Sequence, residues 1–123
     1  RFLAVHSHPE HTDRYVMPGL FHNVEKYLED YDAIFFGHTH MQGKKEFDRG
    51  VILNPGSVGQ PRDKATAAYA VFDTETMETE LYRTGYDIYK VVEEINKRGL
   101  PKGTGERLTP KDKANQRRNN MRY

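Results

Sequence analysis

Short apolar runs separated by polar loops predict an alternation of strands and helices along this chain. Residues 2–5 and 34–36 are continuously apolar, as buried strands are, and a histidine follows each run: His6 after the first and His38 after the second. Between them, apolar residues recur at the spacing of one helical face over residues 20–30. This order of strand, helix and strand favours an α/β fold with neighbouring parallel strands.

Two hairpins are expected in the middle of the chain. Residues 44–47 and 51–53 have strand character and flank a polar turn that ends in a glycine. Residues 67–72 and 79–83 form a similar pair, joined by a polar connection. The segment 54–63 between the hairpins is rich in turn residues and is expected to be a loop.

A last helix is expected over residues 88–98, and its ends are well marked. Asp87 is the expected N-cap, Gly99 stands at the position after the helix, and Pro101 prevents its continuation. Four apolar residues lie on one face of this helix, so one side of it is expected to pack against other residues.

Composition limits the class of protein without indicating a partner. The chain has 123 residues, a formal net charge of +1 and no cysteine. It is therefore the size of one domain, and disulfides and thiolate metal sites are excluded. No apolar run approaches the ~18 residues of a membrane span, so we expect a cytoplasmic protein without membrane contact. Because Arg1 leads directly into a predicted strand, we expect the chain to be a piece of a longer one.

The last eighteen residues differ in charge from the rest. Residues 106–123 contain six basic and two acidic residues and no apolar stripe. We interpret residues 1–105 as the folded part and residues 106–123 as a flexible basic tail, because such a segment cannot bury enough apolar surface to become ordered. Contact with nucleic acid or with an acidic partner is the alternative interpretation, and it is not favoured.

The histidines that follow the two apolar strands are candidate metal ligands. Parallel strands bring their carboxyl ends to one edge of a sheet, so His6 is expected close to His38 and His40 of the sequence GHTH. Imidazoles without thiolates suit Zn, Mn, Fe or Ni better than Ca or Mg. His8 and His11 lie in the following loop and are interpreted as non-ligands, although His8 would replace His6 if the loop carried the ligand.

These motifs together resemble the calcineurin-like metallophosphoesterases, in particular their small single-domain phosphodiesterase branch. The resemblance lies in the histidine that ends LAVH (residues 3–6), in GHTH (residues 37–40) and in NPGSVGQPRD (residues 54–63), and it covers about residues 2–100. It implies an α/β sandwich of two sheets, with a mixed sheet and flanking helices. This chain would be the C-terminal half of that domain.

The resemblance also implies a site for two divalent transition-metal ions, with manganese among the candidates. Such a site hydrolyses a phosphodiester or phosphomonoester with a metal-bridging hydroxide. His6 and His38 match ligands of the second ion, and His40 matches a ligand of the first. The family's other ligands, and the histidine that protonates the leaving group, are not in this sequence. We therefore expect a phosphoesterase fragment that acts on a small phosphate ester only together with its missing half.

Residues 54–63 have two interpretations. In one, Ser57 and the neighbouring backbone amides line a phosphate site, and Arg62 binds the phosphate as a clamp. In the other, the segment is structural: it packs beneath GHTH, and Arg62 and Asp63 form a surface ion pair.

Two functions other than catalysis also stay open. One is a metal-free protein-interaction scaffold on the same fold. The other is a nucleic-acid-binding module that uses the basic tail. The substrate, the identity of the metals and the oligomeric state are not readable from the sequence.

Overall fold

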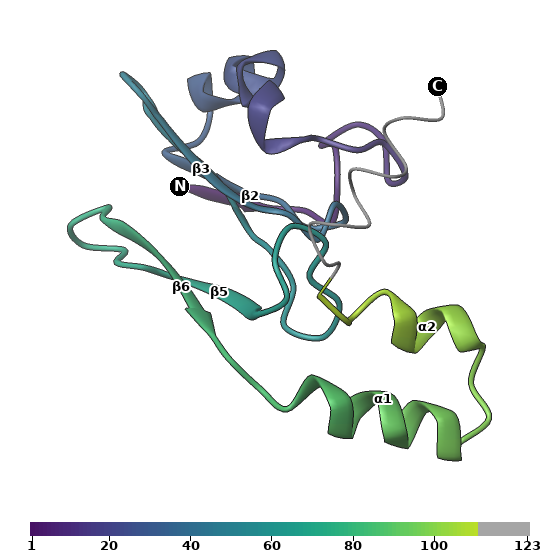
Figure 1. Cartoon of the computed structure of the whole chain (residues 1–123). Helices are drawn as coiled ribbons and strands as arrows, with labels where there is room; N and C mark the ends of the chain where they lie inside the picture. The colour runs from purple at the N-terminus through teal and green to yellow at the C-terminus, as the bar shows by residue number, and fades with distance from the viewer. Residues whose placement is uncertain (111–123) are drawn as a thin grey trace, which may run out of the picture. The chain divides into compact units, whose positions relative to one another are not determined.

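The computed structural model describes residues 1–110 (Figure 1), and the chain divides into two units, Arg1–Tyr86 and Asp87–Tyr123. The two units are described separately below. Most of the predicted basic tail, residues 111–123, lies outside the described residues. Within residues 1–110, no helix is long and apolar enough to cross a membrane.

The first unit is built on a four-stranded mixed sheet. Across the sheet the strands are β1 (Phe2–Ala4), β2 (Ala33–Phe35), β4 (Gly50–Pro55) and β3 (Gln42–Phe47). β1, β2 and β4 are parallel, and β3 pairs antiparallel with β4 across a tight turn. The carboxyl ends of the three parallel strands therefore meet at one edge. The predicted α/β fold with parallel neighbouring strands is confirmed.

One face of this sheet is covered by η1 (Pro18–Glu29), as Figure 1 shows. Its buried side chains and those of the sheet form the core: Phe21, Val24, Leu28, Ile34 and Ile52. The predicted helix is present, but it is a 3₁₀ helix that starts slightly earlier than expected. Pro18 stands at its start, and the backbone of Leu20 departs from helical geometry (φ −116°, ψ 19°). The kink at Leu20 therefore divides η1 into a short first turn and a longer second part.

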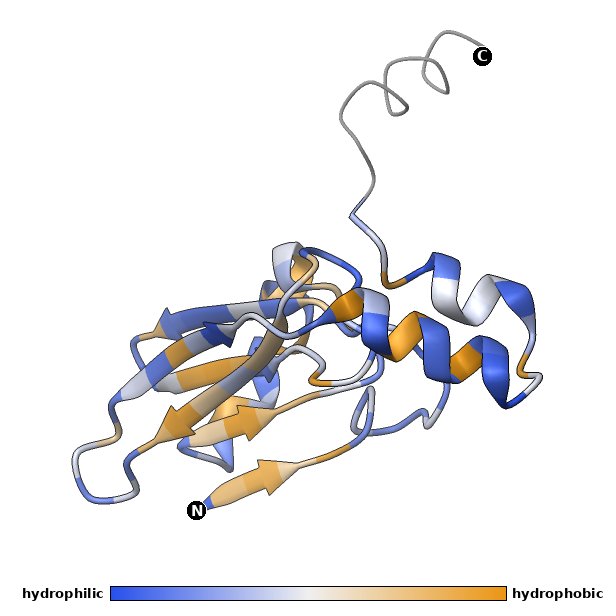
Figure 2. Ribbon diagram, turned by 60° about the horizontal axis from the view of Figure 1, so that its bottom comes forward, coloured by the Kyte–Doolittle hydropathy of each residue, from blue (hydrophilic) through white to orange (hydrophobic). Residues whose placement is uncertain are grey.

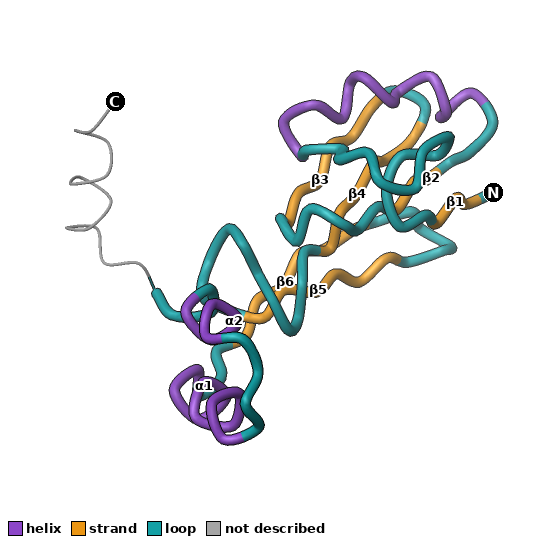
Figure 3. Tube along the Cα trace, turned by 90° about the vertical axis from the view of Figure 1, so that its right-hand side faces the viewer, coloured by secondary structure: helices purple, strands orange, loops and turns teal. Residues whose placement is uncertain are grey.

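The second sheet is the hairpin of β5 (Ala67–Phe72) and β6 (Thr79–Thr84), as predicted. Figure 3 shows it on the side of the four-stranded sheet opposite η1. Phe72 lies edge-on to Phe2 and Phe35, with ring centroids 5.2 and 5.1 Å apart, so aromatic side chains join the two sheets. The expected two-sheet arrangement, with a helix on the outer face, is therefore confirmed.

The second unit contains α1 (Ile88–Lys97) and α2 (Lys102–Glu106). The Asp87 carboxylate accepts the N–H of Lys90 at 3.0 Å, so the predicted N-cap is confirmed. Figure 2 shows the apolar stripe along α1, although none of its residues is fully buried. α2 was not predicted, because its sequence KGTGE contains two glycines and has low helix propensity.

Candidate metal centre

β1 and β2 end at the same edge of the sheet, and a histidine follows each of them. The Gly37 N–H donates to the His6 carbonyl oxygen at 3.0 Å, so the two segments stay paired beyond the ends of the strands. As a result, His6 Nε2 lies 2.9 Å from His38 Nδ1, and the ring centroids are 4.8 Å apart. The expectation that these two strand ends converge is confirmed.

The His6–His38 pair has a spacing that suits two ligands of one ion. Two nitrogen atoms bound to one zinc-like ion at ~2.1 Å lie about 3.0–3.4 Å apart, and the observed separation is 2.9 Å. The opposite nitrogen of His38, Nε2, is buried and has no hydrogen-bond partner among residues 1–110. The Tyr15 ring lies 4.1 Å from the His38 ring and tilts by 30° from it, which restricts that ring. The two nitrogen atoms now share a hydrogen bond, and an ion bound by both imidazoles would replace its proton.

His40 is held by the segment 54–63. Its Nδ1 lies 2.9 Å from the Gln60 carbonyl oxygen, and its own carbonyl accepts the Arg62 N–H at 3.1 Å. A carbonyl partner places the proton on Nδ1 and leaves the lone pair of Nε2 for another ligand, which is the usual second contact of a metal-binding histidine. In the described part of the chain, the donor atoms of His6, His38 and His40 do not all lie within 4.8 Å of one another.

The GHTH turn has an unusual backbone. His38 and His40 have φ angles of +64° and +56°, in the left-handed region that residues other than glycine rarely adopt. Conformations of this kind are unfavourable by roughly 1–3 kcal/mol each, and they persist where the surrounding structure holds them. The contacts that hold this turn are therefore part of the candidate site.

Asn54 supplies the most buried of these contacts. It lies in β4 with 0% of its surface exposed. Its Nδ2 donates to the Gly37 carbonyl oxygen at 2.8 Å and to Thr39 Oγ1 at 2.9 Å. Its Oδ1 accepts the Gly56 N–H at 2.9 Å. From the sequence, Asn54 is expected only as a turn residue, although the apolar run of β4 leads directly into this polar amide.

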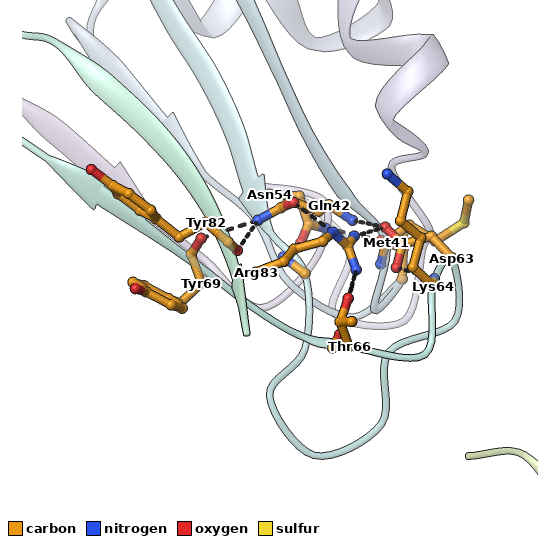
Figure 4. A network of polar contacts seen from close by, with 11 residues as sticks. Met41, Gln42, Asn54, Asp63, Lys64, Thr66, Tyr69, Tyr82 and Arg83 are labelled. Carbon is orange, nitrogen blue, oxygen red and sulfur yellow. Dashed lines mark hydrogen bonds and ion pairs between the residues drawn. The ribbon is translucent and has the colours of Figure 1, made fainter. Parts of the chain in front are cut away.

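A second polar network holds the chain directly after the GHTH turn (Figure 4). The Asp63 carboxylate accepts the Gln42 N–H at 2.8 Å and forms an ion pair with Arg83 of β6. Arg83 Nε donates to Gln42 Oε1 at 3.0 Å. Gln42 Nε2 donates to the carbonyl oxygens of Tyr69 and Tyr82, at 3.0 Å each. The network thus joins the start of β3 to both strands of the second sheet.

The Asp63–Arg83 ion pair corrects one sequence prediction. Asp63 does not form a surface pair with its neighbour Arg62, because β6 brings the Arg83 guanidinium to the inner side of the loop. The two side chains are only 16% and 17% exposed. Burial by itself raises the pKa of the Asp63 carboxyl, but the Gln42 N–H and the Arg83 guanidinium outweigh that effect and bring the pKa below its ordinary value.

Ser57 and Arg62, the two predicted substrate-binding residues, have different surroundings. Ser57 Oγ accepts the Gln60 N–H at 2.9 Å and so helps to shape the loop that holds His40. The Arg62 side chain is exposed and forms no ion pair within residues 1–110. Its charge is therefore not neutralised by any described acidic group. The expectation that the loop packs against GHTH agrees with the contacts of Asn54 and Gln60.

The loop between β1 and η1 gathers a further group of ionisable side chains. His8, Glu10 and His11 each place one donor atom within 4.8 Å of the other two. Burial and the nearby Arg14 guanidinium lower the pKa of His8, and the Tyr27 hydroxyl beside Glu10 lowers the pKa of that carboxyl. From the sequence, His8 and His11 are expected to be non-ligands, and their convergence with Glu10 was not predicted.

Comparison with known proteins identifies the family. Residues 1–77 match the model of the calcineurin-like phosphoesterase superfamily domain. The chain belongs to this superfamily. Its members generally depend on two metal ions and are phosphoesterases. The suspected resemblance is thus confirmed.

Two relatives match this chain over about half of their own length. The uncharacterized protein MJ0912 of Methanocaldococcus jannaschii is 37% identical over 126 residues, which covers 88% of this chain and 51% of that protein. The probable metallophosphoesterase YsnB of Bacillus subtilis is 29% identical over 75 residues, or 61% of this chain and 43% of that protein. The chain therefore spans about half the length of these relatives.

Two solved structures share the fold. A metallophosphoesterase from Sphaerobacter thermophilus matches with a TM-score of 0.76 and 26% identity, over 87% of this chain and 53% of that chain. The hypothetical protein PH1004 from Pyrococcus horikoshii OT3 also matches with a TM-score of 0.76, at 19% identity, over 87% of this chain and 45% of that chain. The second likeness supports the fold alone. The predicted mixed sheet with flanking helices agrees with both.

Proposed function

We propose that this chain forms one part of the dinuclear metal site of a phosphoesterase. In this proposal His6 and His38 bind one divalent transition-metal ion, and His40 binds the adjacent ion. The supporting observation is the 2.9 Å separation of His6 Nε2 and His38 Nδ1 at the carboxyl edge of the parallel strands. The separate support of His40 by the Gln60 carbonyl oxygen suits a ligand of a different ion.

The donor set also indicates what the chain lacks. Each transition-metal ion takes about four or more ligands, and three imidazoles cannot supply two ions. Further ligands, carboxylates above all, are expected from a part of the protein outside this sequence. We therefore propose that the chain alone does not turn over phosphate esters, and that the complete protein does. The imidazole-rich set favours Mn, Zn, Fe or Ni.

The residues of the chain would prepare the site for a phosphate ester. Two bound ions would stabilise charge on the phosphoryl group and activate a water molecule for its hydrolysis. His40 presents the lone pair of Nε2 because its Nδ1 proton is held by a carbonyl oxygen. Arg62 offers an exposed guanidinium that can donate two parallel hydrogen bonds to phosphate oxygens. We assign no residue of this chain as the proton donor for the leaving group.

The experiment compares metal content and turnover in the chain and in the protein extended upstream. Each is loaded with Mn²⁺ and assayed with bis(p-nitrophenyl) phosphate and p-nitrophenyl phosphate, and anomalous scattering at the metal edge locates the ions. We expect turnover only in the extended protein. Equal turnover by both would contradict the expectation that the chain lacks essential ligands.

Single substitutions in the extended protein test the ligand assignment. His6→Asn and His38→Asn should empty the same ion position, and His40→Asn should empty the other. His22→Asn is the matched control, because His22 is exposed on η1. Full occupancy of both positions in all three variants would overturn the assignment. A metal-free scaffold would bind no ion in any variant, and a nucleic-acid module would instead show binding that falls steeply with salt.

A further inference from the structure

We propose that His8, Glu10 and His11 form a separate, mononuclear site for a zinc-like divalent cation in the loop between β1 and η1. These three residues are distinct from His6, His38 and His40, so the proposal does not rest on the proposed function. Within residues 1–110, they are the one group of three histidine or acidic side chains whose donor atoms all lie within 4.8 Å of one another. Two imidazoles and one carboxylate are a set that binds zinc and leaves a position open.

The backbone already brings the two histidines together. The His11 N–H donates to the His8 carbonyl oxygen at 3.1 Å, which closes a turn and places the two rings 5.2 Å apart. The hydroxyl of Ser7, a residue only 2% exposed, donates to the His11 carbonyl oxygen at 2.8 Å and holds the end of the turn. Ligands of one zinc ion lie about 3.0–3.4 Å apart. Side-chain rotation alone can bring the donors to this spacing, so little ordering of the backbone is required.

The contacts that the three side chains now make are easily exchanged for a metal. His8 Nδ1 accepts the Glu10 N–H at 3.1 Å, at an exposed residue where water can replace that bond. The Lys26 ammonium lies 3.8 Å from the Glu10 carboxylate, and both side chains are more than half exposed. Such a surface ion pair is weak, because water and salt screen it. Lys26 is therefore a weak competitor for the carboxylate. The Tyr27 hydroxyl beside Glu10 is a second competitor.

The open position of the site has room for a further ligand. A cavity of about 310 Å³ lies beside the group, and His8, Glu10 and Arg14 are among the residues that line it. In residues 1–110 the Arg14 guanidinium forms no ion pair. An anion such as inorganic phosphate could thus occupy the fourth position and offset the repulsion between Arg14 and the cation.

The test is a titration of the purified protein with Co²⁺, whose visible absorption reports its ligands, followed by calorimetry with Zn²⁺. His11→Asn and Glu10→Gln should each weaken the binding of one ion at least tenfold. Lys26→Met should strengthen the binding of the same ion, because it removes one competitor for the Glu10 carboxylate. His22→Asn is the control for loss of an exposed histidine. His11 and Glu10 are exposed, so these variants should fold, and far-ultraviolet circular dichroism checks this.

The outcomes separate this site from the proposed dinuclear centre. An ion that is lost in His11→Asn and kept in His38→Asn supports a separate site. Absence of any Co²⁺ or Zn²⁺ binding that depends on His11 or Glu10 overturns it and leaves the proposed function unaffected. Loss of the same single ion in both His11→Asn and His38→Asn also overturns it, because the loop would then belong to the dinuclear centre.

Discussion

Replacing Asn54 with alanine tests whether the GHTH turn depends on one buried amide. The substitution removes the hydrogen bonds to Gly37 and Thr39 and the acceptor of the Gly56 N–H. Two of these partners keep another bond, because the Gly37 carbonyl oxygen also accepts the Thr39 N–H at 2.7 Å and Thr39 Oγ1 accepts the Met41 N–H at 3.2 Å. Gly56 has no such replacement.

The expected magnitude follows from this difference. Two lost hydrogen bonds whose partners stay satisfied contribute about 0.5–1.5 kcal/mol each, and the half-buried Gly56 N–H, which loses its acceptor, adds about 1–3 kcal/mol. Together they predict that Asn54→Ala lowers the free energy of unfolding by about 2–6 kcal/mol, a large share of the ~5–15 kcal/mol that stabilises a typical domain. Urea denaturation followed by circular dichroism measures this change.

Two matched variants sharpen the interpretation. Asn54→Asp keeps the shape and the acceptor for Gly56, but it places a carboxylate against two oxygen atoms, so it should be at least as destabilising as alanine. Asn96→Ala, at an exposed position of α1, should change stability by no more than ~0.5 kcal/mol. A loss below about 1 kcal/mol in Asn54→Ala, or an Asn54→Asp variant as stable as the parent, would refute the reasoning.

Of three further predictions, two concern the segment that follows this turn and one concerns the N-cap of α1. Because the folded-state pKa of Asp63 is lowered, its pair with Arg83 should stabilise the fold fully above about pH 4 and less as the pH falls further; acid titration of stability should be flatter in Asp63→Asn than in the parent. Gly56→Ala should destabilise by at least ~1 kcal/mol in urea unfolding, because φ is +87° and the new Cβ would lie 2.7 Å from Ala68 Cβ. Asp87→Ala removes a helix N-cap and should lower helix content and stability by about 1 kcal/mol, measured by thermal circular dichroism.

Most strands could be predicted from the sequence because local patterns mark them. The continuous apolar run of β2 reflects a parallel strand between two others that needs apolar residues on both faces, whereas β1 is a more exposed edge strand. The helix type of η1 could not be predicted, because Phe21, Val24 and Leu28 have the spacing of one α-helical face although the helix is 3₁₀. α2 escaped prediction because its glycines favour a loop and no local signal opposes them.

The candidate ligands and their supports differ in how far the sequence reveals them. His6 and His38 stand directly after predicted strands, so strand pairing alone brings them together. The contacts of the loop 54–63 are not apparent from the sequence. Asp63 pairs with Arg83, twenty positions away, and that pairing depends on the register of the second hairpin. The sequence offers the adjacent Arg62 as a partner instead. A local sequence pattern therefore indicates the ligand residues better than it indicates the contacts that hold them in place.

The strain in the GHTH turn links metal binding to the stability of the fold. Two left-handed histidines are unfavourable by roughly 1–3 kcal/mol each, and Asn54, Gln60 and the Arg62 N–H hold the turn in place. An ion bound by His38 or His40 would add to this support, and at one hundred times its dissociation constant it would stabilise the folded state by about 2.7 kcal/mol. Because that value lies within the range expected for Asn54→Ala, saturating metal should restore much of the stability that this variant loses in the extended protein, which supplies the further ligands. Melting temperatures measured with and without Mn²⁺ would show this, and an equal metal-induced shift in His38→Asn and the parent would exclude the link through that ligand.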